Sequence, residues 1–586
     1  MRVETVRAEG GQAWVVGLVG LRSEQFRRVT LRGEDLDGLT IVEPGLSYDG
    51  DPRLLRLGLQ AHSLGIAYEF DPYFGLSISR VDPLPHQLEA VYEYLLKLPR
   101  VRFLLADDAG AGKTIMAGLL IRELKLRGLV ERVIVACPAN LAFQWQRELK
   151  ERFDEKFLVI KGGDIRDQFG VNQWLEQKQL ITSLDLAKRQ DILPGLRQVH
   201  WDLVVVDEAH RMSWSPPARK TARYALGELL RDSADHVLLL TATPHKGDPQ
   251  NFTLFLQLLD PDAYADVRSI RAAIERQHAP FYLRRTKEAM VYFPERQPDG
   301  QWIARPVFTN RIPHTADFKI DGAEFDLYQE VTRFVKRQSA RAAVQSDDPR
   351  ARAVGFLMSL YQRRLASSTY ALRRSLENRA RRLEENLKRA VDLSQTAPPV
   401  LPDPEDLEEM EEAERERLEE IIEAVSLAAN ADQARAEIAE LRDLAAAAAS
   451  VEAAGVEAKL ERLQGILHEQ GFFDDPDQRL LLFTEFKDTL DYLVTRAKAW
   501  GFRVGFIHGG MKPGSREEPG SRLYAEQQFR DGAIQILVAT EAAGEGINLQ
   551  CCHILFNYDI PWNPNRLEQR MGRIHRYLQT KDCLIF

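Results

Sequence analysis

Short apolar runs alternate with segments of helical periodicity along residues 84–285. A strand that is buried on both faces of a parallel sheet is apolar throughout, whereas the helices between such strands have one apolar face. The runs that fit this description of a strand are 101–105, 132–138, 180–183, 202–206 and 236–240. We therefore predict a parallel-sheet domain over residues 81–290.

The same alternation returns near the end of the chain. Apolar runs occupy residues 480–486, 502–510, 534–540 and 553–558, and a helix is expected from Asn565. Runs of this length that are bounded by turn residues are typical of strands. We predict a second parallel-sheet domain over residues 471–586.

The other segments have different patterns. Residues 1–80 alternate short apolar runs, at 13–19, 28–31 and 40–42, with Gly, Asp and Pro, which predicts a small β-rich module. Residues 291–470 are strongly charged and mostly helical in pattern. We predict that they form a helical insertion between the two sheets.

Two stretches of this insertion carry opposite charge. Between Arg363 and Arg389 there are nine basic and three acidic residues. This surplus suits contact with nucleic acid, but it suits a solvated helix face equally well. The segment 407–425 is acidic around an apolar stripe, which predicts a hairpin-like element packed on one side.

Length and composition limit the classes of protein. A chain of 586 residues, 44% of them hydrophobic, holds roughly three or four domains with real cores. It has no apolar run of about 18 residues and no secretory pattern at its start, so we expect a cytoplasmic protein without a membrane partner. Four cysteines without a Cys-x-x-Cys spacing argue against a disulfide framework and a zinc cluster. The net charge of −9 does not favour a nucleic-acid binder, but it averages over clefts that can be locally basic.

A glycine-rich turn, Ala106–Thr114, lies between the first predicted strand and a helix. Glycines in such a turn let backbone N–H groups approach phosphate oxygens, and the helix N-terminus attracts anions. Lys113 would reach the β- and γ-phosphates, and the Thr114 hydroxyl can bind Mg²⁺. The ligand that we predict is Mg·ATP or Mg·GTP, although Asp107 stands where the full pattern has glycine. The residues expected to hold it are Gly110, Ala111, Gly112, Lys113 and Thr114.

Two carboxylates, Asp207 and Glu208, follow the apolar run 202–206. The carboxyl ends of parallel strands form the edge at which open α/β sheets bind ligands. Asp207 is therefore placed to bind Mg²⁺ through water, and Glu208 to orient and deprotonate an attacking water. The alternative is that these carboxylates form an acidic turn exposed to solvent. The glycine-rich, phosphate-binding turn upstream (the P-loop) disfavours this alternative.

Three polar residues have weaker assignments. Gln87, at the start of the first predicted helix, can pair with the N6/N7 edge of adenine, which would select ATP. It is otherwise an ordinary helix residue. Thr241 and Thr243 follow the strand 236–240, where their hydroxyls either sense the γ-phosphate or simply end the strand in a turn.

Arg573 and Arg576 are three residues apart on the last predicted helix, so they share one face. Arginines that a second domain presents to a triphosphate held by the first can stabilise the charge of the transition state. They act only when the cleft between the domains closes, which couples hydrolysis to domain motion. Taken singly, a basic helix is more often a surface feature.

Together these stretches resemble the superfamily 2 helicase-related ATPases and, among them, the Swi/Snf-type DNA translocases. Two elements, Leu283–Lys287 and Trp562–Pro564, favour this group over DEAD-box or DEAH-type RNA helicases. The matching stretches are residues 85–87, 107–114, 137–138, 144–145, 181–183, 207–210, 240–244, 281–287, 482–486, 508–511, 540–550, 562–564 and 569–576.

The resemblance implies an α/β fold with two RecA-like parallel-sheet domains, which hydrolyse ATP with Mg²⁺ and track along double-stranded DNA, usually without separating its strands. It implies that Arg573 and Arg576 are arginine fingers and that Gln569 and Gly544 are further nucleotide contacts. It also accounts for Asp107, because the family has Asp at this position of the Walker motif. Four further residues would lie along the DNA backbone, where neutral polar groups serve more than base contacts. These are Pro138, Ser183, Thr484 and Thr540.

The likeness is greatest to bacterial members, including the RNA-polymerase recycling factor and helicase-like components of phage-defence systems. We therefore expect double-stranded DNA as a partner, together with transcription or defence proteins. Two alternatives stay open: a strand-separating DNA or RNA helicase, and a scaffold subunit that binds nucleotide as a switch. The intact Lys113, Glu208, Arg573 and Arg576 disfavour the switch.

Three features depart from the family pattern. The segment 512–523 is longer and richer in Gly, Pro and Ser than expected, and Leu578 stands where glycine is usual. The chain also stops within an apolar run, 582–586, that has the pattern of a strand just begun. We therefore expect the chain to be a fragment whose second domain is incomplete.

Overall fold

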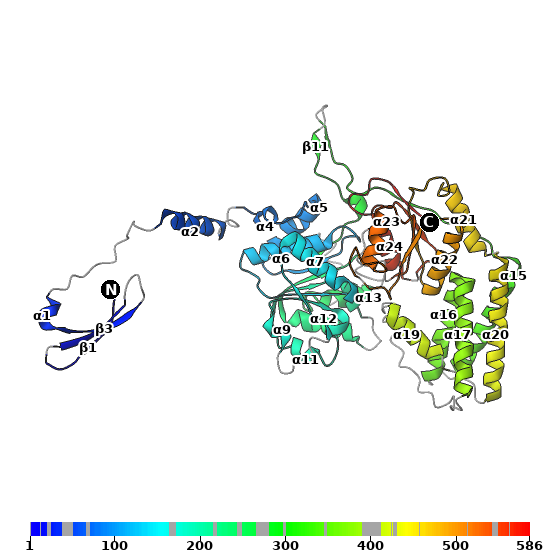
Figure 1. Cartoon of the computed structure of the whole chain (residues 1–586), viewed down its shortest axis with the longest axis horizontal. Coiled ribbons are helices and arrows are strands. Elements are labelled where there is room, and N and C mark those ends of the chain that lie inside the picture. Colours follow the sequence, from blue (N-terminus) through cyan, green and yellow to red (C-terminus); the bar gives the residue numbers. More distant parts are fainter. Residues whose placement is uncertain are drawn as a thin grey trace. The chain divides into compact units, whose positions relative to one another are not determined.

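The structure of the protein is a computed structural model, and it forms two compact units, Met1–Pro72 and Tyr73–Phe586 (Figure 1). The residues that it describes are 2–11, 13–19, 25–37, 51–65, 71–162, 172–214, 220–242, 249–264, 281–296, 301–344, 349–388, 412–423, 425, 431–455, 457–512, 514–541, 549–561 and 563–586.

The first unit contains a small antiparallel sheet in which the strands pair in the order β1-β2-β3. Its elements are β1 (Arg2–Ala8), β2 (Ala13–Val19), β3 (Phe26–Arg32), α1 (Gly33–Leu36) and α2 (Pro52–Gly65). The predicted β-rich module is confirmed by β2 and β3. The apolar run 40–42, which was also expected to be a strand, lies outside the described residues.

A seven-stranded parallel sheet forms the first domain of the second unit, with the order β10-β4-β9-β8-β5-β7-β6. Its strands are β4 (Arg102–Leu105), β5 (Val133–Cys137), β6 (Leu158–Val159), β7 (Gln179–Ser183), β8 (Trp201–Val206), β9 (Ala234–Leu240) and β10 (Tyr282–Leu283). The predicted parallel sheet is confirmed, since each apolar run of the sequence forms one of its strands.

Alternate residues of these strands face two separate cores. Ile134 and Val204 belong to one core, whereas Val135 and Val205 belong to the other. This arrangement explains why the runs are apolar throughout, because both faces of the sheet are covered by helices. The helices are α4 (Phe74–Ser77), α5 (Pro85–Leu88), α6 (Lys113–Leu126), α7 (Ala142–Phe153), α9 (Gln173–Glu176), α10 (Leu184–Ala187), α11 (Leu193–Leu196), α12 (Ala222–Asp232) and α13 (Pro249–Gln257).

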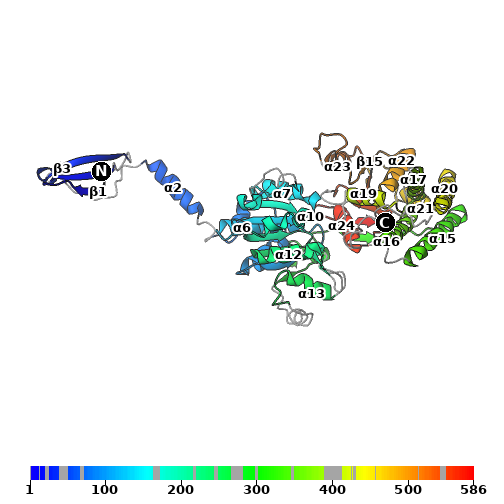
Figure 2. The same ribbon diagram turned by 90° about the horizontal axis from the view of Figure 1, so that it is seen from below.

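A six-stranded parallel sheet forms the second domain, with the order β13-β18-β17-β14-β16-β15. Its elements are β13 (Arg311–Pro313), β14 (Leu480–Phe483), α22 (Lys487–Ala499), β15 (Val504–Ile507), α23 (Arg522–Arg530), β16 (Ile536–Ala539), β17 (Ile554–Asn557), α24 (Pro564–Ile574) and β18 (Cys583–Ile585). Figure 2 labels its edge strand β15 and the helices α22, α23 and α24 of the same domain. The edge strand β13 lies within residues 291–470, the range predicted for the helical insertion. Three residues are too few to show an alternating pattern, so the sequence did not reveal this strand.

Before its helices begin, the insertion also contains a short antiparallel pair of strands, β11 (Glu295–Arg296) and β12 (Trp302–Ile303), and most of its described residues from 322 onward are helical. Leu357, Leu376 and Leu441 belong to one buried core that the helices share, and α17 packs along α20. The helices that share this core are α15 (Gly322–Val344), α16 (Pro349–Ser367), α17 (Thr369–Lys388), α19 (Glu412–Glu423) and α20 (Ala431–Ala454). The leucines of α21 (Ala458–Glu469) belong instead to the core of the second domain.

The arginines of the basic stretch 363–389 mostly join helices. Arg379 is 1% exposed and donates to the Glu437 carboxylate at 2.7 Å, and Arg364 is 8% exposed and pairs with Glu419 at 2.6 Å. Arg373 reaches Glu452 at 2.8 Å. Neither alternative drawn from the sequence, a nucleic-acid surface or a solvated face, describes these side chains. Their acidic partners lie far along the chain, so the sequence pattern did not show the pairing.

Among the described residues, no helix combines the length and the apolar character that crossing a membrane requires.

The buried ion pair of Arg379 and Glu437 predicts how removal of one charge changes the stability of the helical insertion. Glu437→Gln leaves the Arg379 guanidinium buried without its carboxylate, and breaking such a pair costs about 3 kcal/mol or more. We expect the urea midpoint of unfolding, followed by far-UV circular dichroism, to fall clearly. Asp432→Asn is the matched control on the same helix, because its pair with Arg435 is exposed (89% and 69%) and exposed pairs contribute little. Equal midpoints in the two variants would contradict a structural role for the buried pair.

Candidate active site

The predicted P-loop connects β4 to α6 and has the geometry of an anion cradle. Gly110 and Gly112 have φ of 86° and 90°, in the left-handed region that glycine adopts without strain. A Cβ atom on Gly112 would lie 2.2 Å from Nε2 of Gln87, so a side chain is excluded there by contact as well as by conformation. The Lys113 ammonium donates to the carbonyls of Asp107 and Asp108, at 2.6 and 3.2 Å, which keeps it over the loop.

Gln87 holds this loop through a hydrogen bond to its backbone. Its Nε2 donates to the carbonyl of Ala111 at 3.0 Å, and its Oε1 accepts from the backbone N–H of Leu84 at 3.0 Å. His86 Nε2 lies 2.9 Å from the same Ala111 carbonyl. The carboxamide of Gln87 therefore helps to fix the P-loop, and its contact with adenine stays a prediction.

Asp107 anchors a distant segment to the P-loop. Its carboxylate is fully buried and accepts from the Arg285 guanidinium at 2.6 Å and from the Arg285 backbone N–H at 2.9 Å. The same guanidinium donates to Glu89 at 2.8 Å. Asp107 thus serves as the structural link between the P-loop and the segment after β10, and its contact with nucleotide stays a prediction. No role was predicted for Arg285, although it lies in one of the stretches that carried the family resemblance.

The two carboxylates stand at the carboxyl end of β8, as predicted. Asp207 accepts from Trp145 Nε1 at 2.8 Å and from the backbone N–H of Glu208 at 2.9 Å, while Glu208 adopts a left-handed φ of 49°. Burial of Asp207 and the nearby Glu208 charge raise the pKa of Asp207 to about 6. A cation near Asp207 would lower the cost of its buried negative charge. The indole of Trp145 holds the carboxylate in place, a role that requires the tertiary fold and was missed in the sequence.

The donors present fit a magnesium ion held partly by the nucleotide. The Thr114 hydroxyl and the Asp207 carboxylate line the same cleft as Lys113. Within the described parts of the chain, no group of three or more His, Cys, Asp or Glu side chains forms a closed metal site. Mg²⁺ usually keeps several waters and binds one or two protein groups together with phosphates, so two protein donors suffice.

The second domain completes this cleft. α24 contributes Gln569, Gly572 and Arg573, and the segment after it contributes Arg576, to the lining of a cavity of about 110 Å³, which the P-loop, Asp207 and Glu208 line from the other side. Gln569 Nε2 donates to Glu208 Oε1 at 3.4 Å. Both predicted arginines therefore line the cleft at the P-loop, but they do not share a helix face as expected, because α24 ends at Ile574 and Arg576 lies beyond it. Burial lowers the pKa of Arg576.

The backbones of the two domains meet at glycines. A Cβ atom on Gly572 would lie 3.2 Å from Cβ of Ala109, and one on Gly110 would lie 3.2 Å from Cγ of Arg576. Both distances are shorter than ordinary van der Waals contact, so larger residues would push α24 away from the P-loop. The sequence showed Gly572 only as part of the arginine helix, without this role.

Glu208 is also linked to the end of β9. His210 Nδ1 lies 3.3 Å from Glu208 Oε2 and 3.0 Å from the Thr241 hydroxyl. This chain of contacts connects the carboxylate pair to the strand end that was predicted to sense the γ-phosphate. Thr243, the second hydroxyl of that prediction, lies outside the described residues, and so does Gly544.

The four residues predicted to follow the DNA backbone all stand next to strand ends. Pro138 follows β5, and Ser183 ends β7 and caps α10 by accepting from the Leu186 N–H at 3.1 Å. Thr484 and Thr540 are fully buried, and the Thr484 hydroxyl donates to Asp559 at 2.5 Å. Nothing in the structure tests their contact with DNA, which stays a prediction. Burial means that the two threonine side chains do not face solvent.

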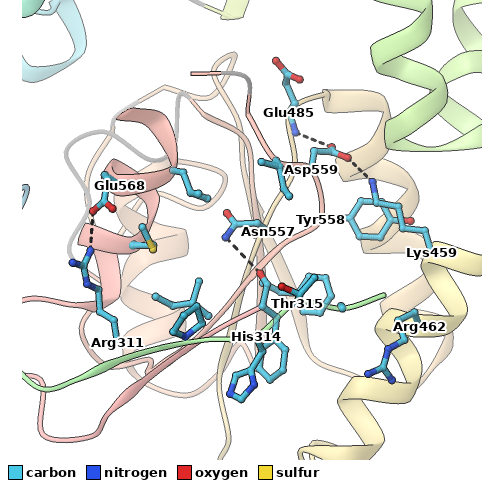
Figure 3. Close-up of a pocket in the computed structure, with 18 of the residues that line it drawn as sticks. Arg311, His314, Thr315, Lys459, Arg462, Glu485, Asn557, Tyr558, Asp559 and Glu568 are labelled. Atoms are coloured by element: carbon cyan, nitrogen blue, oxygen red, sulfur yellow. Dashed lines mark hydrogen bonds and ion pairs between the residues drawn. The ribbon is translucent and has the colours of Figure 1, made fainter. Parts of the chain in front are cut away.

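A larger cavity of about 970 Å³ lies on the second domain (Figure 3). Several of its charged side chains are paired with each other, among them Lys459 with Asp559 at 2.7 Å and Arg311 with Glu568 at 2.8 Å. Glu568 belongs to α24, so this helix lines both cavities. The cavity is separate from the P-loop and does not include the predicted catalytic residues.

Comparison with known proteins identifies two families along the chain. The SNF2-related domain matches residues 86–299, and the helicase conserved C-terminal domain matches residues 458–578. The first match covers the first sheet with its P-loop, and the second covers the strands β14, β15, β16 and β17 of the second sheet together with the arginine helix α24.

The chain is also similar to individual bacterial proteins. It is 28% identical to YqhH of Bacillus subtilis, named as an uncharacterized ATP-dependent helicase, over 86% of this chain and 74% of that protein. It is 27% identical to the RNA polymerase-associated protein RapA of Photobacterium profundum, over 91% of this chain and 50% of RapA. The chain therefore spans about half the length of that relative.

One solved structure, the SWI2/SNF2 ATPase core of Sulfolobus solfataricus in complex with double-stranded DNA, overlaps 86% of this chain and 87% of its own. The identity is 16% and the TM-score is 0.34, values too low to support any statement about ligands. The family matches and the order of the motifs on the two sheets support the assignment without it. The chain therefore contains an SNF2-related domain and a helicase conserved C-terminal domain, which support an ATPase of the helicase type, and its two parallel sheets have the RecA-like fold.

Proposed function

We propose that this protein is a nucleic-acid-dependent ATPase that moves along double-stranded DNA and displaces proteins bound to it. The observation that carries the proposal is the composite cleft, in which a phosphate-binding loop and two carboxylates of one domain face two arginines of the other. Nucleotide bound between two domains ties each turnover to their approach and separation, which is the requirement for a motor.

The name of one bacterial relative indicates where in the cell this activity would take place. RapA is RNA polymerase-associated by name, which favours transcribed DNA over phage defence as the place of action. Chromosomal DNA and RNA polymerase of a bacterium share the cytoplasm, so the proposed activity belongs to that compartment.

Each residue of the cleft has one task in hydrolysis. The P-loop N–H groups and Lys113 hold the β- and γ-phosphates. Glu208 orients the attacking water and accepts its proton, while the water oxygen bonds to the γ-phosphorus and the bond to the β–γ bridging oxygen breaks. Arg573 and Arg576 stabilise the charge that develops on the phosphate oxygens.

Thr114 and Asp207 would hold Mg²⁺, which supplies charge neutralisation for the triphosphate. Trp145 keeps the Asp207 carboxylate oriented toward the cleft through the 2.8 Å hydrogen bond to Oδ2. The raised pKa of Asp207 means that its carboxylate gains a proton as the pH falls through about 6, so the affinity for Mg²⁺ should weaken below that pH.

The role of Glu208 predicts a variant that binds ATP but does not hydrolyse it. Glu208→Gln keeps the size of the side chain and one acceptor oxygen but cannot accept the proton, so we expect kcat to fall by about 10²–10⁴. ATP affinity, measured with a fluorescent analogue, should not change. Glu228→Gln is the matched control, because Glu228 lies on α12 and pairs with Lys220 away from the cleft. Undiminished turnover in Glu208→Gln would remove Glu208 from this role.

Movement along double-stranded DNA predicts which nucleic acid stimulates ATP hydrolysis. Steady-state ATP hydrolysis should rise strongly with duplex DNA and little with single-stranded DNA or RNA, and the stimulation should weaken as salt increases. Lys113→Ala should abolish hydrolysis under every condition, because it removes the phosphate-binding ammonium.

Other outcomes of this measurement would support other functions. Stimulation by single strands or RNA instead of duplex would support a strand-separating helicase. ATP binding without hydrolysis under any condition would support a nucleotide-switch subunit, and either result would contradict the translocase.

A further inference from the structure

Lys287 belongs to the first domain and stands at the boundary between the two domains. It follows the segment that Asp107 anchors, and its backbone N–H donates to the Asp108 carboxylate at 3.1 Å. This bond fixes the start of its side chain beside the P-loop. The residue is only 3% exposed, and its Nζ lies 3.2 Å from the position that a Cβ on Gly110 would take.

The ammonium of Lys287 reaches across to the second domain. It donates to the backbone carbonyl of His575 and lies 3.5 Å from Nδ1 of the His575 ring. His575 directly follows α24, which ends at Ile574. The last carbonyls of a helix have no partner within the helix and carry its partial negative charge, so a lysine there is favourable. Lys287 therefore caps the C-terminus of a helix that belongs to the other domain.

His575 is held in the orientation that this cap requires. Its Nε2 lies 2.7 Å from the carbonyl of Thr309, and because a carbonyl can only accept, Nε2 carries the proton and Nδ1 offers a lone pair to Lys287. Burial, followed by the Lys287 charge, lowers the pKa of His575 to about 4, so the ring is neutral at pH 7. Phe308 packs against it with ring centroids 5.7 Å apart, and its ring also lies 5.2 Å from the Lys287 ammonium.

The cap is needed because the surroundings of Lys287 are positively charged. Among the described residues it forms no ion pair with a carboxylate side chain. Burial and then Arg311 lower the pKa of Lys287 to about 7, with Arg576 and Lys113 acting in the same direction and Asp108 opposing them. The carbonyl of His575 is the acceptor that offsets the burial of this charge.

We propose that Lys287 is a positioning residue for ATP hydrolysis: by capping α24 from the first domain, it holds Arg573 and Arg576 against the P-loop. The inference rests on the proposed role of these two arginines in turnover. The distance from the cap to the arginines is short, since His575 lies between Arg573 and Arg576 in the sequence. Loss of the cap frees the end of α24, since Arg573 lies in its last turn and Arg576 lies two residues beyond Ile574, where the helix ends.

Amide hydrogen exchange tests the cap without ATP. Lys287→Met keeps the length of the side chain but removes the charge and the donors. In nucleotide-free protein we expect exchange of the amides of residues 571–576 to rise by about tenfold or more, because a charged hydrogen bond to the helix end is lost. Exchange in α22 should not change. Lys287→Arg should retain protection, and Lys220→Met is the matched control at an exposed lysine that pairs with Glu228.

Kinetics then test what the cap does. Lys287→Met should lower kcat by about tenfold or more with unchanged ATP affinity, and Lys287→Arg should restore most of the activity. Unchanged exchange of residues 571–576 in Lys287→Met would overturn the proposal. If this variant does not fold, Lys287→Gln, which keeps a neutral donor, is measured in the same way and should show the same loss of protection to a smaller degree.

The two proposals fail in different ways. If Lys287→Met loosens α24 while Arg573→Ala and Arg576→Ala retain full turnover, the cap is correct and the role of the arginines is wrong. If the arginine variants lose turnover while α24 in Lys287→Met keeps its protection and its activity, Lys287 is not a positioning residue.

Discussion

The close approach of α24 to the P-loop is the constraint on which the active site depends. Glycines stand on both sides of this contact, Gly110 in the loop and Gly572 in the helix, and a Cβ on either would meet the other domain at 3.2 Å. The approach puts Arg573 and Arg576 beside the loop that receives the phosphates. A site divided in this way is complete only while the domains touch, so any step that moves them also switches catalysis on or off.

The same contact gathers positive charge. Lys113, Lys287, Arg573 and Arg576 converge on one small region, whereas the buried Asp107 carboxylate is already paired with Arg285. Cations held this close repel each other, and a polyanion between them would turn the repulsion into attraction. Under the proposed function, binding of a triphosphate and closure of the domains would therefore be coupled by electrostatic attraction. Hydrolysis and loss of the γ-phosphate would weaken that attraction, which is the physical basis that we propose for a motor stroke.

The fold and the catalytic motifs were predictable because they depend on local patterns, whereas the supporting contacts were not. Strands such as β5 and β8 are apolar along their whole length, and the P-loop is a contiguous signal. Trp145, Arg285 and Lys287 act only through residues at least 62 positions away in the sequence, a separation that no local pattern reports. The arginines near residue 370 were misinterpreted for the same reason, since Glu437 and Glu452 are their partners.

The most direct test of the divided site is the rate of a single turnover in Arg573→Ala and Arg576→Ala, with ATP affinity measured on the same samples. Arginine fingers contribute about 10³–10⁵ in kcat, so we expect a loss of that order in at least one variant with unchanged affinity. Arg566→Ala is the control, because Arg566 lies on the same helix but does not line the cleft. Normal turnover in both arginine variants would contradict a site completed by the second domain.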